Sequence, residues 1–294
     1  MTRQPHAPVI LNAQSLRAWP LPVVSDDADK EARGAILVVA GSREMPGAAM
    51  LAATAALRAG AGKLVIATVR SMATGLALSV PEARVIGLPE TPGGGLAMAG
   101  VPELEEVAAG CAAAVIGPGL MDDQGSCDFV AGLFPALAHC PVVLDALAMD
   151  VALRIAPFAV PVLLTPHAGE MAHLTRLSKE AICAEPHSVA MEAASRWNAV
   201  VALKGATTVI ATPEGRMWTH EGGAAGLATS GSGDTLAGII GGLAARGASL
   251  EQACAWGIVL HAAAGERLSR KCPLGFLARE LPGEVPAALH QLSK

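Results

Sequence analysis

Short apolar runs recur along the chain and alternate with longer segments that can form helices. Polar residues do not alternate with apolar ones inside the runs, which is typical of strands buried on both faces. Buried strands separated by helices predict an α/β fold with a mostly parallel central sheet and helices on both of its faces. The runs lie at residues 36–40, 64–68, 114–117, 142–145, 162–165 and 200–204.

The pattern changes toward the end of the chain. Residues 208–212 and 216–220 flank Pro213-Glu214-Gly215 and predict a β-hairpin. Residues 1–33 are Pro-rich and mixed in charge, and we expect an arm or a short helix there. Because no internal repeat or linker is visible, we expect one domain over residues 1–294 with this short arm at its start. Helices are expected at residues 47–59, 234–246, 251–268 and 284–292, and a Gly-rich loop at 91–100.

The composition narrows the class of protein. The 294 residues are 52% hydrophobic, and there is no Tyr, so small side chains must build much of the core. The net charge of −5, without a long basic run, argues against nucleic acid or an anionic membrane as a partner. No apolar run is long enough to span a bilayer and no signal peptide is visible, so we expect a cytoplasmic protein.

Six cysteines are scattered along the chain without a C-x-x-C pair. Neither a disulfide framework nor a zinc framework is therefore expected, and free thiols in a reducing compartment fit better.

The segment Gly231-Ser232-Gly233-Asp234 precedes an Ala- and Gly-rich apolar run that predicts a buried helix. Unpaired amides and the positive dipole end at a helix N-terminus attract phosphate, and glycines leave room for it. A carboxylate there is poorly placed for binding alone, but well placed to take a proton from a hydroxyl that attacks the phosphate. The segment predicts phosphoryl transfer with Asp234 as general base; the alternative is that Asp234 merely caps a helix.

Other polar residues fall at the ends of predicted strands, where ligands bind in sheets of this kind. Lys204 either contacts nucleotide phosphates or extends to solvent. Asp145 either holds a Mg²⁺-bound water or caps a helix. Gly117-Pro118-Gly119 exposes backbone at the same edge, or is an ordinary turn between a strand and a helix.

Residues 165–170 predict a helix start directly after a strand, with Thr165 as N-cap and Pro166 as the first helical residue. His167 and Glu170 would share one face of this helix, but two such residues are too few for a metal site. His167 therefore lies in a substrate pocket or has a structural role. The remaining residues are expected to have structural roles only. We expect His261 to be a hydrogen-bonded helix histidine, Trp256 and Met50 to lie in the core, and Asp122-Asp123 to form a solvated turn.

Several of these segments together resemble one family, the ADP-dependent NAD(P)H-hydrate dehydratases, whose fold is ribokinase-like. The final G-x-G-D is shared with many sugar and vitamin kinases, whereas M-P-G-A-A and T-P-H-x-G-E are more particular to the dehydratases. The matching segments follow the family's order: Gly41-Ser-Arg-Glu-Met-Pro-Gly-Ala-Ala49, Gly60-Ala-Gly62, Gly117-Pro-Gly-Leu120, Leu164-Thr-Pro-His-Ala-Gly-Glu-Met171, Leu203-Lys-Gly-Ala-Thr-Thr208 and Ala228-Thr-Ser-Gly-Ser-Gly-Asp234.

The chain departs from the family pattern at three places that bear on metal and pocket contacts. Met121 stands where members often have Gly, and Leu147 replaces the second aspartate of L-D-A-D-A-L. Ala224-Ala225-Gly226 replaces an N-P-G. The segment before residue 35 is too short for the partner epimerase domain, so none is expected.

The resemblance implies that ADP phosphorylates the hydroxyl gained at C6 of the reduced nicotinamide ring. Loss of the phosphate then restores NADH or NADPH, with AMP and phosphate as products. Asp234 would be the general base and would also contact the hydrated cofactor, and Mg²⁺ would bridge the nucleotide phosphates, mostly through water. A homo-oligomer is implied, with a tetramer favoured. The implied substrate contacts are Ala48, Gly119 and His167, and the implied nucleotide contacts are Lys204, Gly205, Ala206, Thr207, Thr208, Gly231 and Gly233.

Two other functions use the same residues. An ATP-dependent kinase of a small alcohol, such as a hydroxymethylpyrimidine, a hydroxyethylthiazole or a sugar, would use Asp234 and stop at the phosphoester. A non-catalytic nucleotide-binding or regulatory protein on this fold is the third alternative, and the intact Gly231-to-Asp234 turn makes it the weakest.

Overall fold

The computed structural model describes residues 7–23, 25, 27, 29–121 and 124–294, so the expected turn at Asp122-Asp123 lies outside the described residues. The strands are β1 (Val9–Ile10), β2 (Ala35–Val39), β3 (Lys63–Val69), β4 (Arg84–Leu88), β5 (Ala113–Ile116), β6 (Val142–Leu144), β7 (Val162–Leu164), β8 (Val200–Leu203), β9 (Thr207–Ala211) and β10 (Met217–Glu221).

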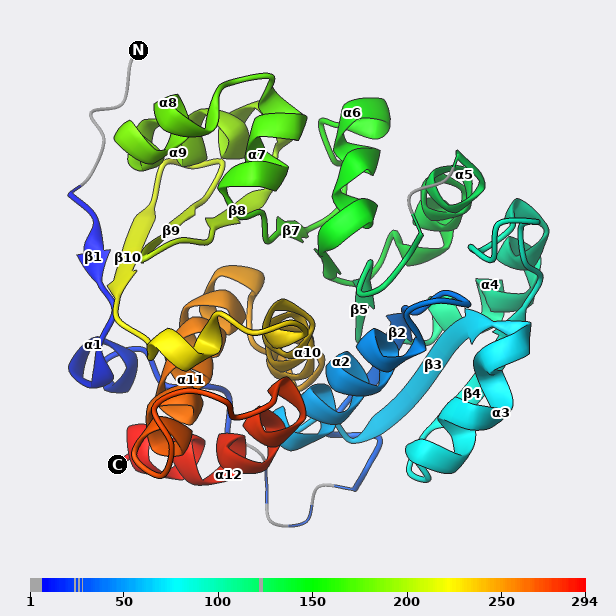
Figure 1. Cartoon of the computed structure of the whole chain (residues 1–294), viewed down its shortest axis with the longest axis horizontal. Helices are drawn as coiled ribbons and strands as arrows, with labels where there is room; N and C mark the ends of the chain where they lie inside the picture. The colour runs from blue at the N-terminus through cyan, green and yellow to red at the C-terminus, as the bar shows by residue number, and fades with distance from the viewer. Residues whose placement is uncertain (1–6, 24, 26, 28, 122–123) are drawn as a thin grey trace.

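These strands form one sheet in the order β1-β10-β9-β8-β7-β6-β5-β2-β3-β4 (Figure 1). β9 runs antiparallel to β8 and β10, and every other neighbouring pair is parallel. The predicted α/β fold with a mostly parallel sheet is confirmed, and so is the hairpin, which is β9 and β10. The carboxyl ends of β5 to β8 therefore meet at one edge of the sheet.

Helices cover both faces of the sheet (Figure 1). Along β2, Ile36 and Val38 join one core cluster, which includes buried residues of α2, α10 and α11, whereas Leu37 and Val39 join the cluster on the other face. The α-helices are α1 (Ala13–Arg17), α2 (Pro46–Ala59), α3 (Arg70–Ser79), α4 (Val101–Ala109), α5 (Gln124–Leu133), α6 (Ala152–Ile155), α7 (Ala168–Thr175), α8 (Lys179–Ala184), α9 (Pro186–Trp197), α10 (Ser232–Ala245), α11 (Leu250–Ser269) and α12 (Leu281–Leu292). Short 3₁₀ helices lie at η1 (Met98–Gly100), η2 (Phe134–Leu137), η3 (Ala146–Val151), η4 (Ala225–Leu227) and η5 (Ala278–Glu280).

Two edge strands are absent from the sequence prediction. β4 lies at the sheet edge and is only partly buried, so it lacks the continuous apolar signature of the inner strands. β1 lies in the predicted arm and pairs with β10. The arm is also held by Trp19, whose ring stacks on Trp218 at 5.4 Å and whose carbonyl accepts a hydrogen bond from Trp256 Nε1 at 2.9 Å.

Among the described residues, no helix combines the length and the apolar character that a membrane crossing requires.

Helices α2 and α10 touch backbone to backbone. A Cβ atom at Gly238 would lie 2.1 Å from the carbonyl oxygen of Ala52, and one at Gly242 would lie 2.3 Å from that of Ala56. Ala52 and Ala56 are fully buried at this contact. The small residues of both helices therefore set how close α10 lies to α2, and with it the position of the α10 N-terminus at the carboxyl edge of the sheet.

Gly238→Ala is expected to destabilise the protein by about 1–3 kcal/mol, because the added methyl must push two helix backbones apart. Gly75→Ala is the matched control, since Gly75 is also helical but a Cβ atom there would meet no neighbouring atom within 4 Å. Filling that open position should leave stability unchanged or raise it by roughly 0.5–1 kcal/mol. Urea denaturation of both variants checks this, and equal stability of the two would contradict the contact.

Candidate active site

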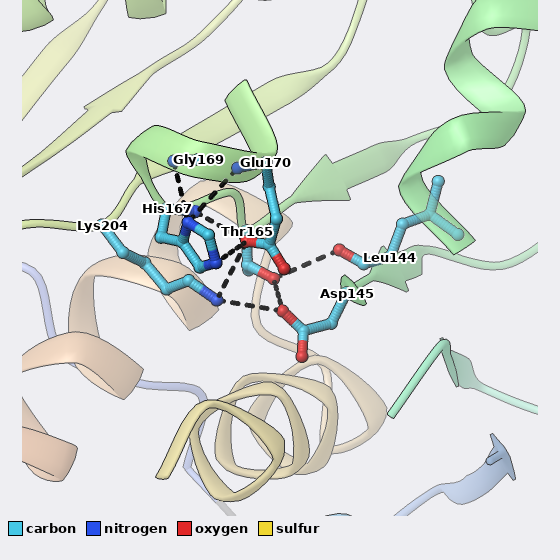
Figure 2. A network of polar contacts seen from close by, with 7 residues as sticks. All are labelled: Leu144, Asp145, Thr165, His167, Gly169, Glu170 and Lys204. Atoms are coloured by element: carbon cyan, nitrogen blue, oxygen red, sulfur yellow. Dashed lines mark hydrogen bonds and ion pairs between the residues drawn. The ribbon is translucent and has the colours of Figure 1, made fainter. Parts of the chain in front are cut away.

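Three polar side chains converge where three neighbouring strands end (Figure 2). Asp145 follows β6, Thr165 follows β7 and Lys204 follows β8. Asp145 Oδ1 accepts hydrogen bonds from Thr165 Oγ1 at 2.6 Å and from Lys204 Nζ at 3.1 Å. A second carboxylate, Glu170, places Oε2 3.9 Å from the same Nζ. The parallel register of β6, β7 and β8 thus assembles a buried ion pair at the sheet edge.

Backbone pairing fixes the position of Lys204 at the sheet edge. Lys204 N–H donates to the carbonyl of Pro166 at 2.7 Å, which continues the pairing of β7 and β8 beyond their ends. Burial alone lowers the pKa of Lys204, but the negative charges of Asp145 and Glu170 outweigh it and raise the pKa above its ordinary value. Lys204 is therefore a permanent cation at neutral pH, and the alternative of a lysine extended into solvent is wrong.

The glycine turn forms the N-terminus of α10 as predicted. Gly231 is the N-cap with φ +86°, a left-handed conformation that glycine adopts without strain. The first helical hydrogen bond runs from Thr235 N–H to the Gly231 carbonyl at 3.1 Å, so the amides of Gly233 and Asp234 precede it and face the helix end. This end has the donors and the dipole that an anion requires.

Asp234 stands in the first turn of α10 and its side chain makes no hydrogen bond to any described residue, so the capping alternative is not supported. Gly233 separates it from the ion pair: a Cβ there would lie 3.6 Å from Lys204 Nζ and 4.0 Å from Asp145 Oδ2. Burial, and then the negative charge of Asp145, raise the pKa of Asp234 to about 6, against the opposing effect of Lys204. A carboxyl with this pKa can accept a proton near neutral pH.

His261, from α11, contacts the glycine turn at the start of α10. Its Nε2 lies 3.0 Å from Ser232 Oγ, and burial lowers the pKa of His261 to about 4, so the ring is neutral. The expectation of a satisfied helix histidine is confirmed, and Trp256 is core as expected.

Ala48, at the start of α2 just after the turn that follows β2, and Gly119, in the turn that follows β5, meet at the same edge of the sheet. Gly119 has φ +66°, and a Cβ on it would lie 2.6 Å from the Ala48 Cβ. Gly41 N–H donates to the Pro118 carbonyl at 2.8 Å and holds the two turns together. Glycine is required at position 119 by both its conformation and this close approach.

His167, not Thr165, is the N-cap of α7, so that part of the prediction is wrong. His167 Nδ1 accepts hydrogen bonds from Gly169 N–H at 2.9 Å and Glu170 N–H at 3.2 Å, while Glu170 Oε2 accepts from His167 N–H at 2.8 Å. Thr165 does not cap the helix, because the backbone stays paired with the segment after β8 as far as His167 and α7 begins only at Ala168. His167 thus has a structural role through Nδ1, and its side chain remains 59% exposed.

The remaining predicted nucleotide contacts form the turn that leads from β8 into β9. Gly205 and Ala206 are exposed there, and Thr207 and Thr208 are half-buried at the start of β9. Asp145 and Glu170 belong to the same cluster; the sequence left Asp145 between a Mg²⁺-bound water and a helix cap, and it gave Glu170 no role in the site. Asp145 occupies the N-cap position of η3 without a side-chain capping bond, so its carboxylate is available to the cluster.

A cavity of about 540 Å³ opens beside this cluster, and its lining includes the polar His167 and Glu170 and the apolar Leu120, Leu147 and Met149. A larger cavity, of about 740 Å³, touches none of the cluster residues: Pro141, Pro161 and Ser249 line it. These residues stand at the opposite edge, since Pro141 and Pro161 precede β6 and β7. Size therefore does not identify the reactive cavity, and the convergence of charged groups does.

Comparisons with known proteins show which proteins the chain is similar to. A family model described as NAD(P)H-hydrate dehydratase matches residues 36–286. An ADP-dependent (S)-NAD(P)H-hydrate dehydratase from Xanthomonas campestris is 48% identical over 285 residues, which cover 97% of this chain and 97% of the relative.

Solved structures agree as well. The structure of an ADP/ATP-dependent NAD(P)H-hydrate dehydratase from Bacillus subtilis, co-crystallised with ATP and Mg²⁺, has a TM-score of 0.83 and 33% identity, covering 96% of this chain and 97% of that one. A ribokinase-like superfamily protein from Enterococcus faecalis has a TM-score of 0.84 at 23% identity, with 97% of this chain and 96% of that one covered, and supports the ribokinase-like fold alone. The residues matched, the coverage and the fold together place this chain in the NAD(P)H-hydrate dehydratase family.

Proposed function

We propose that this protein catalyses the ADP-dependent dehydration of the S epimer of hydrated NADH or NADPH, and so repairs a damaged cofactor. The observation that carries the chemistry is Asp234, a carboxyl of raised pKa in an anion-binding helix end beside a buried lysine. The substrate is that of the similar enzyme from Xanthomonas campestris, which matches along nearly the whole chain. The chain would act as one domain with a short N-terminal arm.

The reaction assigns a separate task to each group. The Asp234 carboxylate takes the proton of the C6 hydroxyl as its oxygen attacks the β-phosphorus of ADP, and AMP leaves. The amides of Gly233 and Asp234 hold the transferring phosphoryl group, and the charge of Lys204 offsets its negative charge. Phosphate then leaves C6 as inorganic phosphate while C5 releases a proton to solvent, and the electron pair of that C–H bond restores the double bond lost on hydration.

Carboxylate oxygens suited to Mg²⁺ lie within the same cluster. Both hydrogen bonds to the Asp145 carboxylate fall on Oδ1, and Oδ2 is directed toward the Gly233 turn. In the part of the chain that the structure describes, the strand-end carboxylates do not bring three ligand atoms together, which favours contact through water. Asp145 and Glu170 would hold these waters, and the bound ion would supply positive charge that offsets the charge of the nucleotide phosphates.

The test is an absorbance assay at the reduced-nicotinamide band with hydrated NADH and either ADP or ATP. Recovery of the band with release of AMP and phosphate supports the dehydratase. A phosphorylated small alcohol, formed with ATP while the band stays absent, would instead support the kinase. A homo-oligomeric state and a cytoplasmic location remain predictions from the sequence and the family resemblance.

Asp234→Asn is expected to lower turnover by about 10²–10⁴-fold while ADP still binds, because the amide cannot accept the proton. The variant should also melt at a higher temperature at pH 7. Since the folded-state pKa of Asp234 is raised to about 6, ionisation destabilises the fold as pH rises through that value, and the neutral amide removes this effect.

Steady-state rates, ADP titration and thermal melts at pH 7 check both parts of this prediction. Glu106→Gln, at an exposed position of α4, is the control that also neutralises one carboxylate. It should change neither the turnover rate nor the melting temperature. Near-normal turnover of Asp234→Asn would refute the role of the general base.

The rate should fall as pH drops below about 6, because the base must be ionised. Asp145→Asn should move this acidic limb of kcat/KM to lower pH: it removes a negative charge that raises the pKa of Asp234 and leaves the positive charge of Lys204 in place. Rate profiles of both proteins between about pH 4.5 and 8 measure the shift. A limb that stays in place or moves upward would show that Asp145 and Asp234 are not coupled.

Lys204→Gln and His167→Asn should separate the two ligands. Gln keeps a donor for Asp145 but loses the charge. The KM for ADP should therefore rise by about tenfold or more, because losing one charge-assisted hydrogen bond costs roughly 1.5–3 kcal/mol. Asn keeps the cap of α7, so His167→Asn should raise the KM for hydrated NADH and leave that for ADP unchanged. A larger rise for ADP in the His167 variant would place this residue on the nucleotide side of the site.

A further inference from the structure

A second group of reactive side chains lies at the amino edge of the sheet, opposite the candidate active site. Cys111 precedes β5, and His139 and Cys140 precede β6. Because β5 and β6 are parallel neighbours, with Ala114 opposite Val142, the turns before them lie side by side. The Sγ atoms of Cys111 and Cys140 are 3.5 Å apart.

The histidine completes a set of three ligand atoms. One ring nitrogen of His139 and the two sulfur atoms all lie within 4.8 Å of one another, and the described residues contain no other group of this kind. His139 Nε2 also lies 3.1 Å from the carbonyl oxygen of Cys111. If Nε2–H donates to that oxygen, Nδ1 keeps the lone pair that a metal ion needs, which is the usual arrangement around metal-bound histidines.

The spacing of the sulfur atoms fits a shared metal ion. Tetrahedral zinc with Zn–S bonds of about 2.3 Å places two thiolate sulfurs about 3.8 Å apart. A disulfide bond would require about 2.05 Å. The observed 3.5 Å is therefore close to the edge of a zinc tetrahedron and needs only a small outward shift.

Burial and protonation agree with such a site. Cys111 is 5% and Cys140 2% exposed, whereas His139 is exposed, so the open side of the group faces solvent. A hydrogen bond joins the two sulfur atoms, and either thiol can be its donor. A metal ion would displace both thiol protons to the solvent, and its affinity would increase with pH.

We propose that Cys111, His139 and Cys140 form a binding site for a thiophilic divalent cation, Zn²⁺, with water in the fourth position. The ion would join the turns before β5 and β6 and brace the amino edge of the sheet. The proposal is independent of the proposed enzymatic function, because none of its residues lies in the strand-end cluster. The sequence spacing hides the site, since its cysteines come from two different turns.

The test uses the full chain with the exposed Cys183 and Cys272 replaced by Ser, so that surface thiols do not contribute. This reference protein is reduced with a phosphine, freed of metal by a chelator, and titrated with Co²⁺ and then Zn²⁺. We expect one equivalent of Co²⁺ to give a thiolate-to-metal charge-transfer band and the strong visible bands of a tetrahedral ion, and Zn²⁺ to bleach both.

Variants then assign the ligands. Cys140→Ser and Cys111→Ser should each weaken or abolish the charge-transfer band. His139→Ala, at an exposed position that the fold tolerates, should keep the band but lower the affinity for Zn²⁺ at least about tenfold, the smallest effect expected when a metal site loses a partner. His290→Ala, in the last turn of α12, is the matched control and should bind as the reference protein does.

Three results would overturn the proposal. The reduced reference protein could give no charge-transfer band, the band could survive both serine substitutions, or His139→Ala could bind Zn²⁺ with unchanged affinity. Mass spectrometry of the unreduced protein adds an alternative: a Cys111–Cys140 disulfide, together with no metal uptake after reduction, would assign the pair to redox chemistry. Turnover of hydrated NADH should be the same in the His139→Ala and His290→Ala variants.

Discussion

The buried carboxylate of Asp145 sets the arrangement of the candidate site, because a buried negative charge needs partners. Its partners come from the two neighbouring strand ends, Thr165 after β7 and Lys204 after β8. Pairing with them fixes the lysine, and the lysine lies beside Gly233 in the turn of α10. The sheet edge and the helix end are thus joined by charge as well as by packing. A substitution that removes the charge of Asp145 would therefore change the pKa of both Lys204 and Asp234.

In this arrangement, the environment that Asp234 needs for function lowers the stability of the fold. Asp234 lies where burial and the charge of Asp145 both favour its protonated form, so its ionised form at neutral pH destabilises the fold. That unfavourable environment is what gives the carboxyl the basicity required for proton transfer near neutral pH. Lys204 limits the effect, since its positive charge acts in the opposite direction. The balance of two fixed charges around one carboxyl therefore tunes the base.

The sequence predicted the inner strands and the strand-end residues well, because buried parallel strands have a continuous apolar pattern and end at a common edge. It failed at β4, where partial exposure at the sheet edge interrupts the pattern. It also failed at His167, since pairing with Lys204 from another strand extends the strand-like backbone to His167 and delays the start of α7 to Ala168. The Cys111 and Cys140 pair was out of reach for a related reason: spacing along the chain says nothing about two turns that meet only in the folded sheet.

The contact between α2 and α10 also has a consequence for how the protein is made. These helices pack backbone to backbone although they lie near opposite ends of the chain. During synthesis, the buried alanine face of α2 leaves the ribosome long before its partner exists, and contacts of such high sequence separation form slowly. Lys204 and the glycine turn also arrive late. The apolar face of α2 therefore stays unpaired with α10 until the last helices have been synthesised. A product truncated before α10 would lack the glycine turn of the site and would leave this face of α2 exposed to solvent.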